Sequence, residues 1–223
     1  MKSTEQEESL GVRINKNLAD NWKLYTVLFA SLIVVIAAIL VIGFVNKNNT
    51  IASSELAEDI QQAYESWMSA PDDQKSTDEL DSLISEAIKK YPSKFAAQRA
   101  YFTRGLVAME NEDWETAVDS FSVLAEKWPE SYLAPVSLFN AAAASEEKGD
   151  IDSSMTYLIQ LKDKYSDSSP YAPEALFNLG RLSEKKGDKD KAVEYYKSVG
   201  STFPQSRWTN LSKSRILVLE NRS

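Results

Sequence analysis

The sequence of 223 residues contains neither cysteine nor histidine. Without cysteine the chain forms no disulfide and has no thiolate nucleophile, and without histidine it lacks a common metal ligand and the usual general base. Zinc sites of the usual kind and catalytic triads are therefore excluded. An enzyme made from this chain would depend on carboxylates, lysine, tyrosine or hydroxyl groups. The sequence predicts no catalytic, cofactor-binding or metal-binding residues, and we expect a non-enzymatic protein without a cofactor.

Charge is absent from one long stretch, Leu24 to Val45, in which most residues are Leu, Ile, Val or Phe. A helix of that length measures about 33 Å, which matches the hydrocarbon core of a bilayer at about 30 Å. At about 0.3 to 0.6 kcal/mol for each of these residues, insertion is favoured by several kcal/mol. The apolar part of a cleaved signal peptide is shorter, at about 7 to 15 residues, and ends in small residues. We therefore expect residues 24–45 to be a retained transmembrane anchor.

Basic residues near the two ends of this stretch predict its orientation. Arg13, Lys16 and Lys23 precede it, whereas Lys47 is the single basic residue that follows it before Lys75. Because basic residues stay on the cytoplasmic side, residues 1–23 should be a short cytoplasmic tail. Residues 46–223 should then be an exported domain, which in a bacterium places it in the periplasm on the outer side of the inner membrane.

Net charge is uneven along the exported part. Residues 46–180 carry 11 basic and 24 acidic side chains, and residues 181–223 carry 10 basic and 5 acidic ones. The acidic part repels phosphate backbones, so we do not expect nucleic acid as a partner.

An aromatic residue recurs at almost constant intervals, at Tyr91, Trp128, Tyr165 and Phe203, and proline follows three of the four. Between these points the apolar residues have helical spacing, interrupted by the polar turns "ENED", "EKGD" and "KKGD". Each interval therefore predicts two helices joined by a short turn. The turn sequences "GDID" and "GDKD" lack the spacing of a calcium-binding loop, so we interpret them as connections between helices.

Small residues also recur at fixed positions in these predicted helix pairs. The first helices have Gly105, Ala142 and Gly180, and twelve residues later the second helices have Ala117, Ser154 and Ala192. Four residues further on, the second helices have the bulky residues Phe121, Leu158 and Tyr196. We expect the small residues to let the paired helices approach closely, and the bulky ones to fill the gap to the neighbouring pair. Pro129 and Pro204 should end their helices, because proline lacks the amide donor.

This pattern resembles the tetratricopeptide repeat. The resemblance implies an all-α fold in which one transmembrane helix precedes an α-solenoid of about four helical hairpins with a C-terminal capping helix. The expected hairpins are 52–92, 94–129, 132–166 and 171–204, and the expected cap is 205–220. In the first hairpin the small residues are missing, and "SAPDDQKST" predicts a long connecting loop.

In such a stack the first helices line a concave face that binds extended segments or helices of other proteins. The predicted groove residues are Arg99, Phe102, Leu106, Met109, Val136, Phe139, Glu146, Glu174, Phe177 and Arg181. The three phenylalanines occupy equivalent repeat positions, and two interpretations are open: they pack between units, or they form an apolar floor for a bound segment.

The combination of anchor and repeats resembles a bacterial inner-membrane protein group known as an ancillary subunit of the Sec translocon, which implies translocon subunits or periplasmic chaperones as partners. The repeats also resemble those of the coordinators of the Tol-Pal system, which implies a role among envelope proteins. Two other hypotheses are a regulator that faces the cytoplasm and a hydrolase that uses Asp72, Asp73 and Asp81. The sequence makes no prediction of the oligomeric state.

Overall fold

The computed structural model describes residues 10–221, and its contacts divide the chain into two compact units, Met1–Ala52 and Ser53–Ser223. In the first unit, helix α1 (Leu10–Asp20) is followed after a single turn residue by helix α2 (Trp22–Ser69), which continues into the second unit. The described residues of the first unit are almost all exposed, so this unit has no core of its own.

Helix α2 contains the apolar stretch that the sequence predicts to be an anchor. By length and composition it is the one helix among the described residues that could cross a membrane, and its most apolar window of 18 residues is entirely unburied. The polar residues that follow this stretch do not end the helix. Neither proline nor glycine occurs between residues 46 and 69, and the Thr50 hydroxyl donates a hydrogen bond to the Asn46 carbonyl at 2.8 Å within the helix.

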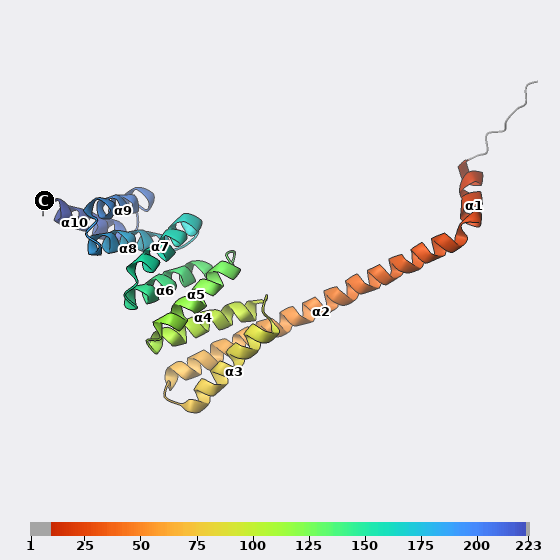
Figure 1. The fold of residues 1–223 in the computed structure, drawn as a ribbon, viewed down its shortest axis with the longest axis horizontal. Coiled ribbons are helices and arrows are strands. Elements are labelled where there is room, and N and C mark those ends of the chain that lie inside the picture. Colours follow the sequence, from red (N-terminus) through yellow and green to blue (C-terminus); the bar gives the residue numbers. More distant parts are fainter. Residues whose placement is uncertain (1–9, 222–223) are drawn as a thin grey trace, which may run out of the picture. The chain divides into compact units, whose positions relative to one another are not determined.

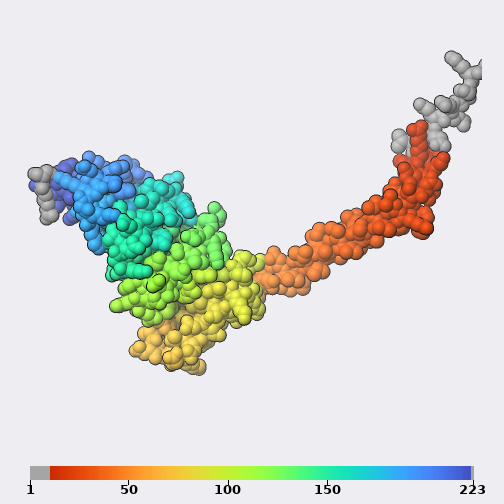
Figure 2. All heavy atoms as spheres, viewed as in Figure 1, coloured from red at the N-terminus to blue at the C-terminus, as the bar shows by residue number. Residues whose placement is uncertain are grey.

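The second unit is a stack of antiparallel helices, and from α3 onward each helix packs against the next one along the chain (Figure 1). In Figure 2 the colours of successive segments follow one another along this stack. The helices that follow α2 are α3 (Gln74–Lys90), α4 (Phe95–Glu110), α5 (Trp114–Lys127), α6 (Ala134–Glu147), α7 (Ile151–Tyr165), α8 (Ala172–Lys185), α9 (Lys189–Thr202) and α10 (Arg207–Glu220). The described residues form no strand, so the prediction of an all-α solenoid is confirmed.

The small and bulky repeat positions meet inside the hairpins α4–α5 and α8–α9. A Cβ atom on Gly105 would lie 2.7 Å from the ring of Phe121, and one on Gly180 would lie 2.6 Å from the ring of Tyr196. Each of these two rings therefore lies against the glycine of its own hairpin. The sequence pattern predicts the rings only in the gap to the neighbouring hairpin. Phe121 and Tyr196 are almost completely buried, which contributes about 2 to 3 kcal/mol each.

Helices end at the recurring aromatic residues. Tyr91, Trp128 and Phe203 are the C-caps of α3, α5 and α9, and the backbone N–H of each donates to the carbonyl four residues earlier. The prolines after these residues cannot extend the helix, so the prediction of a repeated helix stop is confirmed. In the remaining hairpin, α7 ends at Tyr165 itself.

The first hairpin differs from the prediction in one respect. Only residues 70–73 connect α2 to α3, so the expected long loop is wrong. Asp73 caps α3, because its carboxylate accepts a hydrogen bond from the backbone N–H of Ser76 at 3.0 Å. This cap lets the helix begin within the segment that looked like a loop.

Helix α10 closes the stack as predicted, since it packs against α9 and also contacts α8. Its N-cap Ser206 accepts a hydrogen bond from the backbone N–H of Trp208, and Thr209 and Ser212 are its buried residues. On its outer side Leu217 is 61% exposed.

Candidate protein-binding site

The predicted groove residues lie on the first helices of three hairpins, α4, α6 and α8, as the repeat pattern required. The three phenylalanines are partly buried in contacts with other aromatic rings. Phe102 packs edge-on against Phe121 at 5.7 Å between ring centroids, and Phe139 stacks on Tyr171 at 5.3 Å. Phe177, in α8, lies 4.8 Å from the ring of Trp208 in α10. These contacts agree with the interpretation that the rings pack between helices and units.

The aliphatic groove residues have two kinds of surroundings. Leu106 and Met109 are partly buried against the core cluster of α4, α5 and α6. Val136 packs beside a second cluster, which includes Leu133 and Ala134, and also lines a surface hollow. Val136 is thus placed beside a space that a ligand could enter.

Two of the charged groove residues, Arg99 and Glu174, contact side chains outside the groove. The Arg99 guanidinium donates to Gln61 Oε1 at 3.1 Å and to the Tyr132 hydroxyl at 3.3 Å. The Glu174 carboxylate lies 4.0 Å from the guanidinium of Arg207. Arg99 therefore connects the first hairpin to the loop that follows the second.

Glu146 and Arg181 form a two-pronged ion pair between neighbouring units, with N–O distances of 2.7 and 2.5 Å. Glu146 is only 20% exposed, and Lys185 adds a third contact at 3.5 Å. Hydrogen bonding to Arg181 lowers the pKa of the Glu146 carboxyl and raises the pKa of the arginine. The pair therefore stays ionised and joins α6 to α8, so these two side chains are engaged with each other.

A hollow of about 940 Å³ opens beside this groove, at the edge where second helices end and first helices begin. Three tyrosines and three prolines in or next to the connections between units are among the residues that line it: Tyr132, Tyr165, Tyr171, Pro129, Pro135 and Pro170. Phe102, Leu133 and Val136 add to its apolar lining, and Glu130 and Lys164 bring opposite charges to it. Its volume is in the range of about 300 to 1,000 Å³ that is typical of ligand pockets.

Hydrogen bonds hold the connections that form this hollow. The Tyr165 hydroxyl donates to the Pro129 carbonyl at 2.7 Å, and the Ser131 hydroxyl donates to Gln98 Oε1 at 2.7 Å. Burial, with a smaller contribution from Glu130, raises the pKa of Tyr165. That phenol therefore stays protonated and remains a hydrogen-bond donor at neutral pH. Tyr132 is 66% exposed, so its ring is accessible to a partner.

The same connection borders a second, smaller hollow of about 480 Å³, which Gln98, Lys127 and Trp128 line together with residues 129–132. Tyr132 thus stands between two hollows. Apolar walls with few polar groups suit an extended protein segment, because aromatic rings pack well against prolines and aliphatic side chains.

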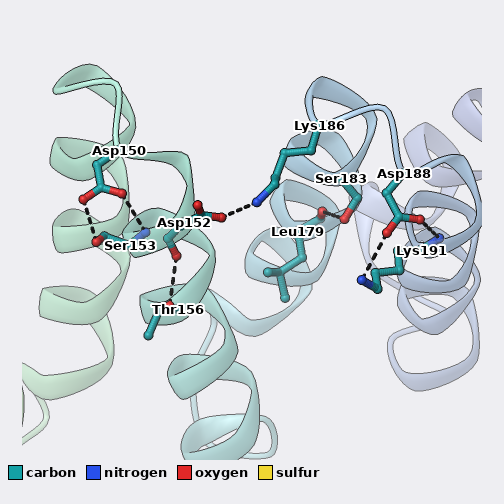
Figure 3. A network of polar contacts seen from close by, with 9 residues as sticks. All are labelled: Asp150, Asp152, Ser153, Thr156, Leu179, Ser183, Lys186, Asp188 and Lys191. Carbon is teal, nitrogen blue, oxygen red and sulfur yellow. Dashed lines mark hydrogen bonds and ion pairs between the residues drawn. The ribbon is translucent and has the colours of Figure 1, made fainter.

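The turn motifs have a structural role (Figure 3). Asp113, Asp150 and Asp188 cap α5, α7 and α9, because each carboxylate accepts a hydrogen bond from a backbone N–H three residues later. Figure 3 shows the caps at Asp150 and Asp188. These hydrogen bonds, from a side chain and the backbone together, lower the pKa of all three carboxyls. The interpretation of "GDID" and "GDKD" as connections between helices is confirmed. The turns need a left-handed residue, which Gly149 and Gly187 supply with φ of 87° and 79°.

The carboxylates of the hydrolase hypothesis do not form a site. Asp73 is occupied as the cap of α3, and Asp72 and Asp81 are exposed. Within residues 10–221 no group of three or more acidic side chains could hold a metal ion.

Comparison with known families gives three matches to a model described as tetratricopeptide repeat, at residues 99–131, 136–168 and 174–206. These three segments of the chain are similar to the tetratricopeptide repeat family. They coincide with the hairpins α4–α5, α6–α7 and α8–α9, whereas the hairpin of α2 and α3 lies outside the matches. The repeat prediction is therefore confirmed for the part of the chain whose small and bulky positions carried it.

Solved structures show the same fold. A protein from Podosopora anserina with nearly identical TPR-like repeats is 14% identical, with a TM-score of 0.60 over 76% of this chain and 86% of its own. A tetratricopeptide repeat protein from Parabacteroides merdae is 13% identical, with a TM-score of 0.57 over 75% of this chain and 61% of its own. No curated protein sequence matches the chain. At these identities the likeness concerns the fold alone.

Sequence reasoning did not find the hollow between the tetratricopeptide repeats. Its signal was present in the connections "ESYLAP" and "SPYAP", which make these repeats longer than the usual 34 residues and contain exposed tyrosine and proline. Tyr132 and Pro170 are not helix stops or core residues, and exposed residues of this kind on a loop are characteristic of binding.

Proposed function

We propose that this chain is a non-enzymatic, membrane-anchored scaffold that binds other proteins through its tetratricopeptide repeats. The single observation that carries this proposal is the hollow between the repeats, with its tyrosine and proline walls. It adjoins the groove that repeats of this kind use, and it shares Phe102 and Val136 with the predicted groove residues. The occupant that fits is an extended protein segment with proline or aliphatic side chains.

The proposed anchor is residues 24–45 within α2, with residues 1–23 in the cytoplasm and 46–223 outside it. Support comes from the unburied apolar window of α2 and from the three basic residues that precede the stretch, Arg13, Lys16 and Lys23. Exposure of this apolar surface to water is unfavourable, whereas the hydrocarbon core of a membrane accommodates it. The resemblance to the ancillary translocon subunit supports the bacterial inner membrane as the location and the export machinery, periplasmic chaperones or other envelope proteins as partners.

Two experiments test this function separately. The first fuses a reporter that is active in only one compartment after Ser223, in cells that express the full chain. Activity outside the cytoplasm is expected. A reporter that works only in the cytoplasm would overturn the orientation and support the alternative of a regulator that faces the cytoplasm.

The second experiment replaces Tyr132 with the photoreactive p-benzoylphenylalanine, which preserves an aromatic ring, and cross-links in cells. Capture of a defined protein segment, mapped by mass spectrometry, is expected from position 132. The matched control carries the same residue in place of Thr156, which is exposed on α7 and does not line the hollow. Equal capture of the same segment from both positions would contradict the proposed site.

A further inference from the structure

Helix α1 and the first turns of α2 meet at Asn21 in a bend, called the elbow here, whose inner side is lined by Ile14, Leu18, Trp22, Tyr25 and Phe29. Ile14, Leu18 and Trp22 belong to the predicted cytoplasmic tail, whereas Tyr25 and Phe29 belong to the predicted anchor. Hydrogen bonds fix the bend: the Asn21 side chain donates to Asn17 Oδ1 at 3.0 Å, and the Tyr25 hydroxyl donates to the same oxygen at 3.1 Å. Figure 1 shows α1 turning away from the direction of α2 at this point.

Helix α1 has two distinct faces. Ile14 and Leu18 are four residues apart on one face and are 51% and 47% exposed. Lys16 lies on the opposite side of the helix, and Arg13 lies at the edge of the apolar face. A helix of 11 residues is marginally stable in water, and no core cluster of the described residues includes its apolar side chains. Its amphipathic pattern is that of a helix that lies on a surface.

The inner side of the elbow is hollow and mostly apolar. One hollow of about 430 Å³ is lined by Arg13, Ile14, Asn17, Leu18 and Tyr25, and an adjoining one of about 700 Å³ includes Leu18, Trp22 and Phe29. The apolar face of α1 is therefore turned toward the start of the apolar stretch of α2. When α2 enters a bilayer, this inner side is the side that meets the lipid.

Charge indicates the kind of lipid. Residues 10–23 carry three basic side chains, Arg13, Lys16 and Lys23, against the single acidic residue Asp20. Trp22 and Tyr25 are the aromatic residues that favour the boundary between headgroups and acyl chains. Each basic residue near an anionic leaflet contributes about 1 kcal/mol, which corresponds to about a five-fold preference.

We propose that the elbow binds an anionic phospholipid of the leaflet at the N-terminal end of the anchor. Ile14 and Leu18 contact its acyl chains, Arg13 binds its phosphate from the edge of the apolar face, and Lys16 adds positive charge on the side that faces water. Helix α1 then lies in the membrane interface instead of extending into the cytoplasm as a free tail. This inference rests on the proposed anchoring of residues 24–45.

The absence of cysteine makes a direct test possible with the full chain, because a single introduced cysteine is the only labelled site. A fluorescent nitrobenzoxadiazole group is attached to Ile14→Cys, Leu18→Cys or Lys16→Cys. Each protein is reconstituted in vesicles that contain phosphatidylcholine and phosphatidylglycerol in a molar ratio of two to one. Labels at 14 and 18 are expected to be protected from aqueous iodide, whereas the label at 16 is expected to be quenched.

The lipid preference is measured with spin-labelled quenchers in the same vesicles. At equal mole fraction, spin-labelled phosphatidylglycerol should quench the label at 18 more strongly than spin-labelled phosphatidylcholine does. The difference should correspond to a local enrichment of phosphatidylglycerol of about five-fold or more. The double variant Arg13→Gln with Lys16→Gln should lose this preference. Its circular dichroism should match that of the parent, because glutamine is as good a helix former as the residues it replaces.

Failure of this inference and failure of the anchor give different results. If alkaline extraction removes the chain from the vesicles, the proposed anchor is wrong and the elbow proposal falls with it. If the chain stays integrated but iodide quenches all three labels equally, only the elbow proposal is wrong. Protection that appears only at high protein-to-lipid ratios would show that a second copy, not lipid, covers the elbow, and would also overturn the proposal.

Discussion

Adding one methyl group at Gly180 should destabilise the repeats, although glycine is a poor helix former. Gly180 lies within α8, where replacement by alanine would ordinarily stabilise the helix by about 0.5 to 1 kcal/mol. Here the new Cβ would lie 2.6 Å from Tyr196 Cε1, closer than unbonded carbon atoms can approach. Either the ring or the helix must move.

The ring of Tyr196 has little freedom to move. It is 1% exposed, its hydroxyl donates to Glu184 Oε1 at 2.6 Å, and the ring of Phe177 lies 5.3 Å away. Overpacking of this kind costs about 1 to 3 kcal/mol. After subtraction of the gain in helix propensity, Gly180→Ala should lower the free energy of unfolding by about 1 kcal/mol. For a unit of this size, that lowers the Tm by about 2 to 4 °C.

Gly200 provides the matched control, because it lies in α9 and a Cβ there would have only Thr209 Cγ2 near it, at 3.8 Å. Gly200→Ala should therefore raise the Tm by about as much as Gly180→Ala lowers it. The assay is thermal unfolding of the full chain in detergent micelles, followed by circular dichroism. If both variants raise the Tm equally, the close packing of first and second helices is refuted.

Three further changes test other parts of the structure. Glu112 has φ of 57° in the turn where the other repeats have glycine, so Glu112→Gly should raise stability to thermal unfolding by about 0.5 to 1 kcal/mol, and no gain would contradict the strained turn. Glu146→Gln should lower the free energy of unfolding by about 1 kcal/mol, a value already reduced because Arg181 is partly exposed. Salt at 0.5 M should make the variant and the parent differ less. A loss of stability that salt does not change would argue against the ion pair. Acid should destabilise the parent. The carboxyls of the aspartate caps have lowered pKa values in the folded chain, so they stabilise the fold at pH values above the ordinary aspartate pKa of about 3.9. This stabilisation is lost as the pH falls through the lower pKa values of the folded chain. Urea unfolding at pH 7 and pH 3 should show a smaller difference when asparagine replaces the three caps Asp113, Asp150 and Asp188.

The repeats could be predicted because their signals are local. Gly105 and Phe121 lie in consecutive helices that a short turn brings into contact, and the same spacing recurs at Gly180 and Tyr196. The aromatic stops and the aspartate caps are set by backbone hydrogen bonds over three or four residues. A sequence records such contacts directly.

Other features could not be predicted from such signals. The extent of α2 depends on the absence of a helix breaker in the polar segment that follows the apolar stretch. The hollow depends on contacts between distant residues, such as Tyr165 with Pro129, in two connections that have no regular structure. The pairing of Glu146 with Arg181 likewise joins different repeats, so the sequence identified both as groove residues but not as partners.

The hollow between the repeats is proposed to hold a segment of another protein, and a variant that fills the hollow should prevent this binding. Ser168 is exposed and lines the hollow, so Ser168→Trp should occupy the space without disturbing the core. The measurement is the yield of the cross-link from p-benzoylphenylalanine at position 132 in this background, with Ser201→Trp as a control at an exposed position outside the hollow. The account predicts that Ser168→Trp abolishes capture of the mapped segment while Ser201→Trp preserves it. Undiminished capture with Ser168→Trp, in a chain of unchanged Tm, would contradict it.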